Sequence, residues 1–188
     1  TPTIAEHLRQ AGYHTYMTGK WHVGERPEHW PLKRGFDRYF GLISGASSFF
    51  EILQEKRKRY MVLQDQEYVL PKEGYYATDA FTDKAIEFIQ GQEPQTKPFF
   101  LYLAYTAPHF PLHAYEADIA KYEALYLQGW DAIRQQRYKK MQGLGLVDKR
   151  YQLSARPADI PDWNSARDKQ NWARKMAGPW MLLCCMAS

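Results

Sequence analysis

The sequence has little cysteine, no long run of like charge and no long apolar run. Its two cysteines, Cys184 and Cys185, are adjacent near the end of the chain, so a mutual disulfide is not expected and no metal-ligand spacing is present. No apolar stretch reaches membrane-spanning length and no signal segment is recognisable, so no membrane partner is expected. The cysteines therefore indicate neither a disulfide framework nor a metal site.

Charge is also modest. The net charge is +4 over 188 residues, and the one basic cluster covers residues 56–59. A cluster this short predicts a solvated turn or a local anion contact, so no nucleic-acid partner is expected. Hydrophobic residues make up 45% of the chain and charged residues 24%, which is typical of a globular protein long enough for one sizeable core.

The first residues combine a helix signal with a strand signal. Thr3 and Glu6 have the spacing of a capping box, apolar residues follow at helical spacing, and Gly12 is placed to end the helix. A strand is predicted directly afterwards, over residues 13–17. This order is typical of α/β folds, in which functional loops follow the carboxyl ends of strands.

Three further elements are predicted in the middle of the chain. Residues 60–63 and 67–70 suggest a small hairpin, and periodic apolar residues predict a helix over 76–90 that Gly91 closes. Residues 99–105 are almost continuously apolar and aromatic, which predicts a strand buried on both faces of a parallel sheet.

The last third is predicted to be helical. A tract over 115–142 breaks near Gly129, and a final helix over 166–176 is expected to be capped by Ser165, whereas residues 178–188 fit neither a helix nor a strand. The charges of the long tract predict a solvated face; they include Asp131, Arg134, Arg137, Lys139 and Lys140.

The clearest candidate site follows the first strand. Lys20 and His22 are two residues apart between Gly19 and Gly24, so an extended chain would place both side chains on one face. Lysine supplies fixed positive charge and histidine exchanges a proton near neutral pH, which together suit an oxyanion. The alternative is an ordinary solvated loop.

A second histidine follows the strand predicted over 99–105. His109 lies between Pro108 and Pro111, which restrict the loop, although a structural or merely exposed histidine is the alternative. Because both loops follow strands of an α/β order, we expect Lys20, His22 and His109 to converge. Aromatic residues between these loops could line a leaving-group pocket, with packing the favoured alternative; they are Trp30, Tyr39, Phe49 and Phe50.

Taken together, these motifs resemble those of a known family. The stretches 11–15, 19–24 (GKWHVG), 31–37, 97–102 (KPFFLY) and 108–112 (PHFPL) occur in the order found in type I sulfatases, close to the arylsulfatases. The resemblance runs from Thr3 to about Asp162. It implies a partial alkaline-phosphatase-like α/β fold with a mostly parallel sheet and flanking helices. Residues 1–177 would be an internal part of the catalytic domain, and 178–188 an atypical tail.

The resemblance also implies a chemistry. Such enzymes cleave sulfate esters, of small molecules or glycans, with a formylglycine made from a Cys/Ser-x-Pro/Ala-x-Arg motif, which is expected before Thr1. Lys20 would contact the sulfate and the formylglycine, His22 would act as a base, and His109 would bind sulfate and assist the leaving oxygen. Ca²⁺ is expected in the full-length protein, with ligands outside these residues. A secreted, periplasmic or lysosomal location is implied.

Two alternatives to a sulfatase remain open on the residues alone. Lysine and histidine bind phosphate as readily as sulfate, which allows a phosphoryl- or phosphonate-ester hydrolase of the same superfamily. The second alternative is an α/β fragment that has no activity of its own. The sequence does not indicate an oligomeric state.

Overall fold

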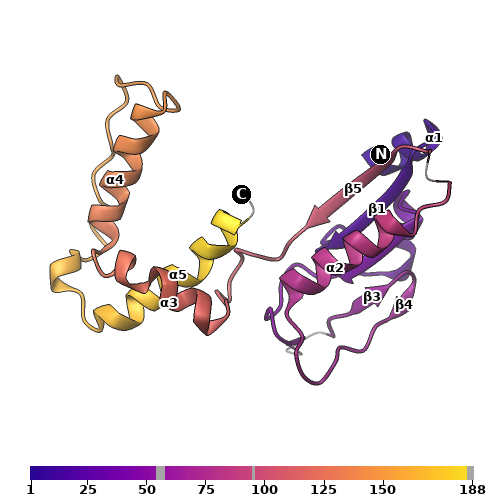
Figure 1. The fold of residues 1–188 in the computed structure, drawn as a ribbon, viewed down its shortest axis with the longest axis horizontal. Coiled ribbons are helices and arrows are strands. Elements are labelled where there is room, and N and C mark those ends of the chain that lie inside the picture. Colours follow the sequence, from indigo (N-terminus) through magenta and orange to yellow (C-terminus); the bar gives the residue numbers. More distant parts are fainter. Residues whose placement is uncertain (54–57, 95, 186–188) are drawn as a thin grey trace. The chain divides into compact units, whose positions relative to one another are not determined.

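The computed structural model describes residues 1–53, 58–94 and 96–185, and the chain divides into two compact units, residues 1–113 and 114–188 (Figure 1). The first unit contains a sheet with helices, and the second is helical. The elements of the first unit are α1 (Ile4–Gln10), β1 (His14–Gly19), two short 3₁₀ turns (Pro27–His29 and Pro31–Arg34), β2 (Arg38–Leu42), β3 (Met61–Leu63), β4 (Gln66–Glu67), α2 (Ala77–Gln90) and β5 (Phe99–Ala104).

The five strands of the first unit form one sheet in the order β4-β3-β2-β1-β5. Strand β1 pairs in parallel with both β2 and β5, while β2–β3 and β3–β4 are antiparallel. The predicted α/β class is therefore confirmed. The sheet is mixed because the predicted hairpin, which is also confirmed, adds its two strands to the parallel part.

Capping chemistry defines α1 as predicted. The Thr3 amide donates to the Glu6 carboxylate at 2.7 Å, and the Glu6 amide donates to the Thr3 hydroxyl at 3.1 Å. The bond from the Thr3 backbone, with help from Arg34, lowers the pKa of Glu6. Gly12 follows the helix with φ 94°, so the chain turns there into β1.

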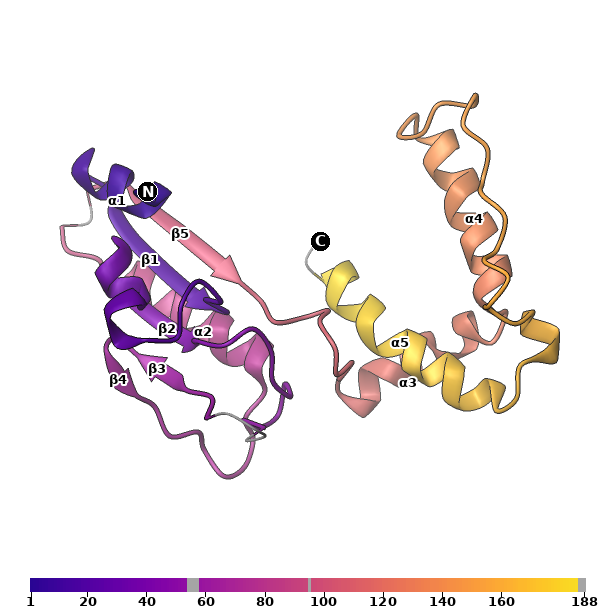
Figure 2. The same cartoon turned by 180° about the vertical axis from the view of Figure 1, so that it is seen from behind.

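Side chains of the central strands alternate between two covered faces. Helix α2 covers one face, where Tyr16 and Phe40 contact Phe88 and Phe81 at ring-centroid distances of 6.1 and 6.0 Å (Figure 1). On the other face, seen from behind in Figure 2, the connection between β1 and β2 supplies the cover. Its core contains Met17, Trp21, Trp30, Phe36 and Tyr39.

Strand β5 forms where it was predicted, but its predicted burial on both faces is wrong. It lies at an edge of the sheet formed by the described residues, and Phe99 and Tyr102 are 43% and 48% exposed. An apolar run predicts a strand that tolerates burial, but it does not determine whether neighbouring chain covers it.

The candidate aromatic pocket is mostly packing, as favoured from the sequence. Trp30, Tyr39 and Phe49 are buried. Phe50 is partly exposed and contacts the ring of Tyr76 at 5.0 Å. These side chains hold the loops together, so the pocket interpretation does not apply to the three buried ones.

The second unit contains α3 (Glu116–Tyr126), α4 (Trp130–Gly143), a 3₁₀ turn (Trp163–Ser165) and α5 (Lys169–Cys185). Helices α3 and α5 pack through Tyr126, Ala173 and Ala177. The predicted break is confirmed at Gly129, which has φ 89° and lies directly before α4. A Cβ at residue 129 would come within 2.2 Å of the Trp163 ring, so glycine also permits this contact.

Two expectations about the last helix are wrong. Helix α5 begins at Lys169, and the Ser165 hydroxyl instead donates to the Asp162 carbonyl within the preceding 3₁₀ turn. The helix also continues through Gly178 to Cys185, where no regular structure was expected. Predictions that concern Lys56, Arg57 and residues 186–188, or the side chains of the two cysteines, lie outside what is described.

Candidate active site

Backbone hydrogen bonds fix the loop that carries Lys20 and His22. The Lys20 amide donates to the Ala104 carbonyl of β5 at 2.7 Å. The next two amides, of Trp21 and His22, donate to the carbonyls of Leu42 and Ile43 at 2.9 and 3.0 Å. The loop is thus held by both strands that flank β1, at the carboxyl edge of the parallel part of the sheet.

Three small residues lie side by side where this loop begins. Gly19 is opposite Ala104 in the β1–β5 register, and Gly41 follows Phe40, which is opposite Thr18. A Cβ on Gly19 would lie 2.0 Å from the Ala104 carbonyl oxygen, and a Cβ on Gly41 would lie 1.8 Å from the Gly19 oxygen. We call Gly41, Gly19 and Ala104 the small-residue row.

The indole of Trp21 packs against the protein core and holds the same loop in place. Its ring is buried, lies edge-on to Phe36 at a centroid distance of 6.1 Å, and donates from Nε1 to the His29 carbonyl at 2.9 Å. Lys20 is half-buried and His22 is exposed. Burial of the indole between them therefore leaves the lysine and the histidine as the polar side chains of residues 19–24 that solvent can reach.

His22 has a backbone conformation that non-glycine residues rarely adopt. Strand β1 ends at Gly19, and His22 has φ 55° in the left-handed region. The expectation that an extended chain puts Lys20 and His22 on one face therefore does not hold. Such strained residues cluster at functional sites when the surrounding structure holds them, as the bond to Ile43 does here.

His109 lies in the loop that follows β5. Its amide donates to the Thr106 carbonyl at 2.9 Å, and its Nδ1 lies 2.6 Å from the Phe110 carbonyl oxygen. Because a carbonyl only accepts, this contact places a proton on Nδ1 and leaves Nε2 outside this bond. The side chain is exposed.

The loops that carry His22 and His109 begin at the same edge of the sheet. Strands β1 and β5 are parallel, and the bond from Lys20 to Ala104 joins the starting points of the two loops. His109 follows Ala104 by five residues. The topology thus brings the two loops together, and convergence of the three side chains themselves stays a prediction.

The loop after β2 contacts both histidine-bearing segments, which the sequence did not reveal. A Cβ on Gly45 would lie 2.6 Å from Cε1 and Nε2 of His22, so the imidazole rests against this glycine. Three residues later, the Ser48 hydroxyl lies 3.2 Å from Nδ1 of His113, in the segment that carries His109. A glycine and a serine in a loop give no sequence signal of such contacts.

Burial changes the pKa of one group beneath this edge. Tyr39 is fully buried and its hydroxyl donates to the Gly19 carbonyl at 3.1 Å, and burial raises its pKa well above the ordinary range. Tyr39 is therefore a neutral support of the small-residue row and not a base.

The described residues do not fit a calcium site on their own. No group of three or more His, Cys, Asp or Glu side chains among them is placed to hold a metal ion. The buried hydroxyls of Thr18 and Ser44 have no hydrogen-bond partner in the described part, but two neutral hydroxyls are not the carboxylate-rich set that Ca²⁺ needs.

Comparison with known proteins decides the family of this α/β chain. The family model described as Sulfatase matches residues 1–153. The chain belongs to the sulfatase family. This confirms the resemblance inferred from the motifs.

Individual sulfatases match over most of this chain. It is 33% identical to an uncharacterized sulfatase of Schizosaccharomyces pombe, over 77% of the chain and 27% of the relative. It is also 33% identical to an arylsulfatase of Klebsiella aerogenes, over 77% of the chain and 32% of the relative. The mouse N-acetylgalactosamine-6-sulfatase is 36% identical over 59% and 23%. The sulfatase chain thus spans about a third or less of these relatives.

Solved structures agree with this family assignment. The crystal structure of Ps i-CgsB is 35% identical with a TM-score of 0.54, and the match covers 63% of this chain and 29% of that one. The PsFucS1 sulfatase from Pseudoalteromonas sp. is 19% identical with a TM-score of 0.50, over 64% and 29%, and shows similarity of fold alone. The alkaline-phosphatase-like α/β fold expected from the motifs is confirmed.

Proposed function

We propose that the protein containing this sulfatase chain hydrolyses sulfate esters, and that Lys20, His22 and His109 act on the ester. The observation that supports this proposal most is the pair of loops after β1 and β5. They start at one sheet edge, are joined by the Lys20–Ala104 bond, and carry the cation and both imidazoles.

The roles follow from the chemistry of each group. Lys20 supplies a fixed positive charge to the sulfate oxygens, on which negative charge is redistributed as the S–O bond breaks; one such donor is worth roughly 3 kcal/mol. His109, protonated on both nitrogens, binds sulfate and gives the Nε2 proton to the leaving oxygen. His22 accepts a proton from a hydroxyl of the formylglycine, and the loss of that proton expels the bound sulfate.

In this proposal, residues outside the described ones supply the nucleophile and the metal ligands. The 188 residues contain no Cys/Ser-x-Pro/Ala-x-Arg motif. We therefore expect the formylglycine, which supplies the attacking hydroxyl, and the Ca²⁺ ligands to lie outside the described residues. A secreted, periplasmic or lysosomal location belongs to the same proposal; among the described helices, none combines the length and hydrophobicity that crossing a membrane requires.

A sulfated glycan is the substrate class that we favour over a simple aryl sulfate. Ps i-CgsB was also solved in complex with a neocarrahexaose, and that structure is 35% identical to this chain with a TM-score of 0.52. Another relative is an N-acetylgalactosamine-6-sulfatase. Both names refer to saccharides.

The test compares two esters of one leaving group in the full-length protein, an aryl sulfate and the matching aryl phosphate. We expect faster turnover of the sulfate and a loss of about a hundredfold or more on Lys20→Ala. Exposed Lys72 provides the control, Lys72→Ala, which should retain activity. Faster turnover of the phosphate, or equal activity of the two lysine variants, would contradict the proposal.

The isolated 188-residue chain provides a second test. We expect the isolated 188 residues to hydrolyse no aryl sulfate, because they lack the nucleophile motif. Turnover by the purified chain above that of its own Lys20→Ala variant would show that the site has been assigned wrongly.

A further inference from the structure

The second unit contains an extended tract with an excess of positive charge. Residues 130–156 contain seven Lys or Arg residues and two Asp or Glu residues, an excess larger than the net charge of the whole chain. From the sequence, the charges of this tract predicted only a solvated face. The structure shows that Asp131, Arg134 and Lys139 of this face also line a groove that is open to solvent.

One face of α4 forms a wall of this groove. The lining residues of the helix recur at intervals of three, one and three, which is the spacing of a single helix face. The opposite wall is the segment 153–156, and the cavity between the walls has a volume of about 510 Å³. The lining residues are Asp131, Arg134, Gln135, Tyr138, Lys139, Gln142, Leu153, Ser154, Ala155 and Arg156. We call this the α4 groove.

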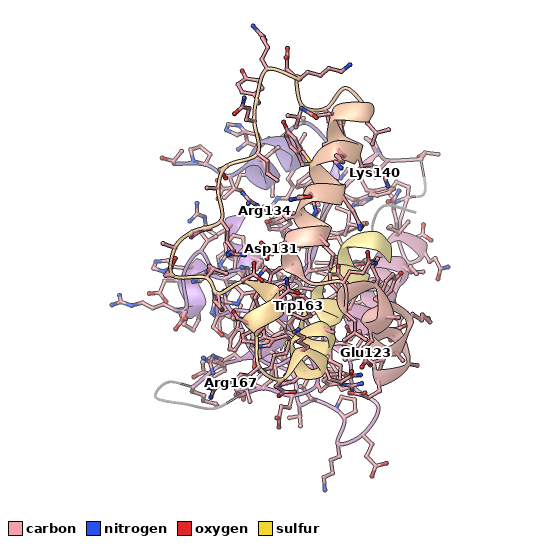
Figure 3. The ribbon with its side chains drawn as sticks, turned by 90° about the vertical axis from the view of Figure 1, so that its left-hand side faces the viewer. Glu123, Asp131, Arg134, Lys140, Trp163 and Arg167 are labelled. Carbon is pink, nitrogen blue, oxygen red and sulfur yellow. The ribbon has the colours of Figure 1, made fainter. Side chains whose placement is uncertain are left out.

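Hydrogen bonds between α4 and the segment 153–156 hold the second wall in an antiparallel register. Arg134 donates to the Ser154 hydroxyl at 2.7 Å, and Arg156 donates to the Asp131 carboxylate at 2.8 Å. Figure 3 shows Asp131 and Arg134 on the side of α4 that faces this returning segment, with Lys140 on the other side of the helix. The groove is therefore built before any ligand arrives, which lowers the entropy cost of binding.

The charges inside the groove are not balanced. Arg156 is bonded to two carboxylates, Asp131 and Asp162, which raise its pKa and neutralise it locally. Arg134 has only the neutral Ser154 hydroxyl, so most of its five N–H donors remain available. Lys139 is exposed and has no carboxylate partner among the described side chains. The α4 groove thus offers two uncompensated cations.

The remaining lining groups suit a sugar. The Tyr138 hydroxyl donates to the Tyr151 carbonyl and accepts from Gln142, so the phenol oxygen is used and the ring is the part that a ligand can pack against. Gln135 adds an amide, and Leu153 adds an apolar surface. A volume near 500 Å³ lies in the usual range for small-molecule sites, about 300–1,000 Å³.

We propose that the α4 groove binds a sulfated oligosaccharide, with Arg134 and Lys139 holding a sulfate group and Tyr138 packing against a sugar ring. The planar guanidinium group can donate two parallel N–H bonds to two oxygens of an oxyanion, and the amides match sugar hydroxyls. Duplex DNA, which carries a charge about every 1.7 Å, is matched better by a long cationic track than by two cations in a short groove. The choice of sulfate as the anion rests on the proposed function; the anion site itself does not.

Binding is measured without turnover, by calorimetric titration of the protein with a sulfated hexasaccharide. The other two ligands are its desulfated counterpart and a single-stranded oligonucleotide of equal charge. We expect measurable affinity for the sulfated sugar alone. A decrease at high salt is also expected, because the groove is open to solvent.

Matched variants locate the site. Arg134→Gln with Lys139→Gln should weaken binding by roughly tenfold or more, because two charged donors are lost. Lys140→Gln with Lys149→Gln removes the same charge from residues that do not line the groove, and should change affinity less than about twofold. Ala155→Trp fills the groove at an exposed position without a charge change and should also abolish binding.

Each outcome of this experiment decides the proposal. Equal losses in the two charge-removing pairs, or full affinity in Ala155→Trp, would overturn the groove as the binding site. Equal affinity for the desulfated sugar, or stronger binding of the oligonucleotide, would overturn the ligand class. The titration measures binding and not hydrolysis. The groove can therefore be shown to bind the sugar even if the proposed sulfatase activity is wrong, and the activity can be shown even if the groove does not bind.

Discussion

Replacing Gly45 with alanine tests whether the His22 imidazole works from the position seen here. The added Cβ would lie 2.6 Å from Cε1 and Nε2 of His22. Carbon atoms pack favourably at about 3.5–4.0 Å, so the ring must move by about 1 Å or rotate away. Residue 45 is not in the left-handed region, so the alanine backbone itself is unstrained.

The expected loss is one of activity and not of stability. A displacement of 1 Å in a catalytic group costs up to about a hundredfold, so kcat of the full-length protein, which includes the sulfate-release step assigned to His22, should fall by about ten- to a hundredfold. His22 is exposed and its ring can turn into solvent, so the free energy of unfolding should change by less than about 1 kcal/mol. Gly143→Ala, with no atom within 4 Å of the added methyl, is the matched control.

A double-mutant cycle shows whether the effect passes through the imidazole. In a His22→Ala background the overlap is gone, so Gly45→Ala should lower kcat no further. The reasoning is refuted if Gly45→Ala is fully active, or if it lowers activity by the same factor with and without the imidazole.

Three further outcomes follow from the same structure. Gly19→Ala should lower the free energy of unfolding by about 3 kcal/mol or more, because φ is 109° and the new Cβ meets a backbone oxygen; a urea-unfolding loss below about 1 kcal/mol would contradict this. In the full-length protein, His22→Ala should slow sulfate release more than release of the leaving alcohol. His109→Ala should instead slow alcohol release, and most for substrates with poor leaving groups. Single-turnover kinetics that find the reverse would show that the two histidines have each other's roles. The folded state lowers the pKa of Glu6 below its ordinary value of 4.5, so the Glu6 carboxylate stabilises the fold above pH 4.5 and loses this effect as pH falls through the lower folded pKa. Glu6→Gln should therefore reduce the acid-induced fall of the urea midpoint. An unchanged pH profile would count against the capping bond.

Local chemistry made much of the fold predictable. The Thr3–Glu6 capping box, the break at Gly129 and the hairpin are each determined by a few neighbouring residues, and each is confirmed. Burial was less predictable, because the apolar run of β5 has the same composition whether or not another chain segment lies beside it. The start of α5 was missed because Ser165 and Asp168 are both acceptable caps, and only the 3₁₀ turn decides between them.

The candidate site was predictable in its residue types but not in its supports. Lys20 and His22 stand out because charged groups between glycines follow a strand. Their placement depends on bonds to Ala104, Leu42 and Ile43, which are distant in sequence. The contact between Gly45 and His22 could not be inferred either. A glycine has no side chain, so the sequence does not show which neighbour occupies the space beside it.

The small-residue row has a consequence for how this sheet edge tolerates mutation. At Gly19 and Gly41 an added methyl would collide with backbone oxygens, which have no alternative rotamer to move into. Variation at these two positions is therefore costly, whereas the exposed loop residues that follow are free of that restriction. A combinatorial library that keeps the row, the buried Trp21 and the proposed catalytic residues constant and randomises the other exposed loop residues would retain folded members, so new specificities are best sought there.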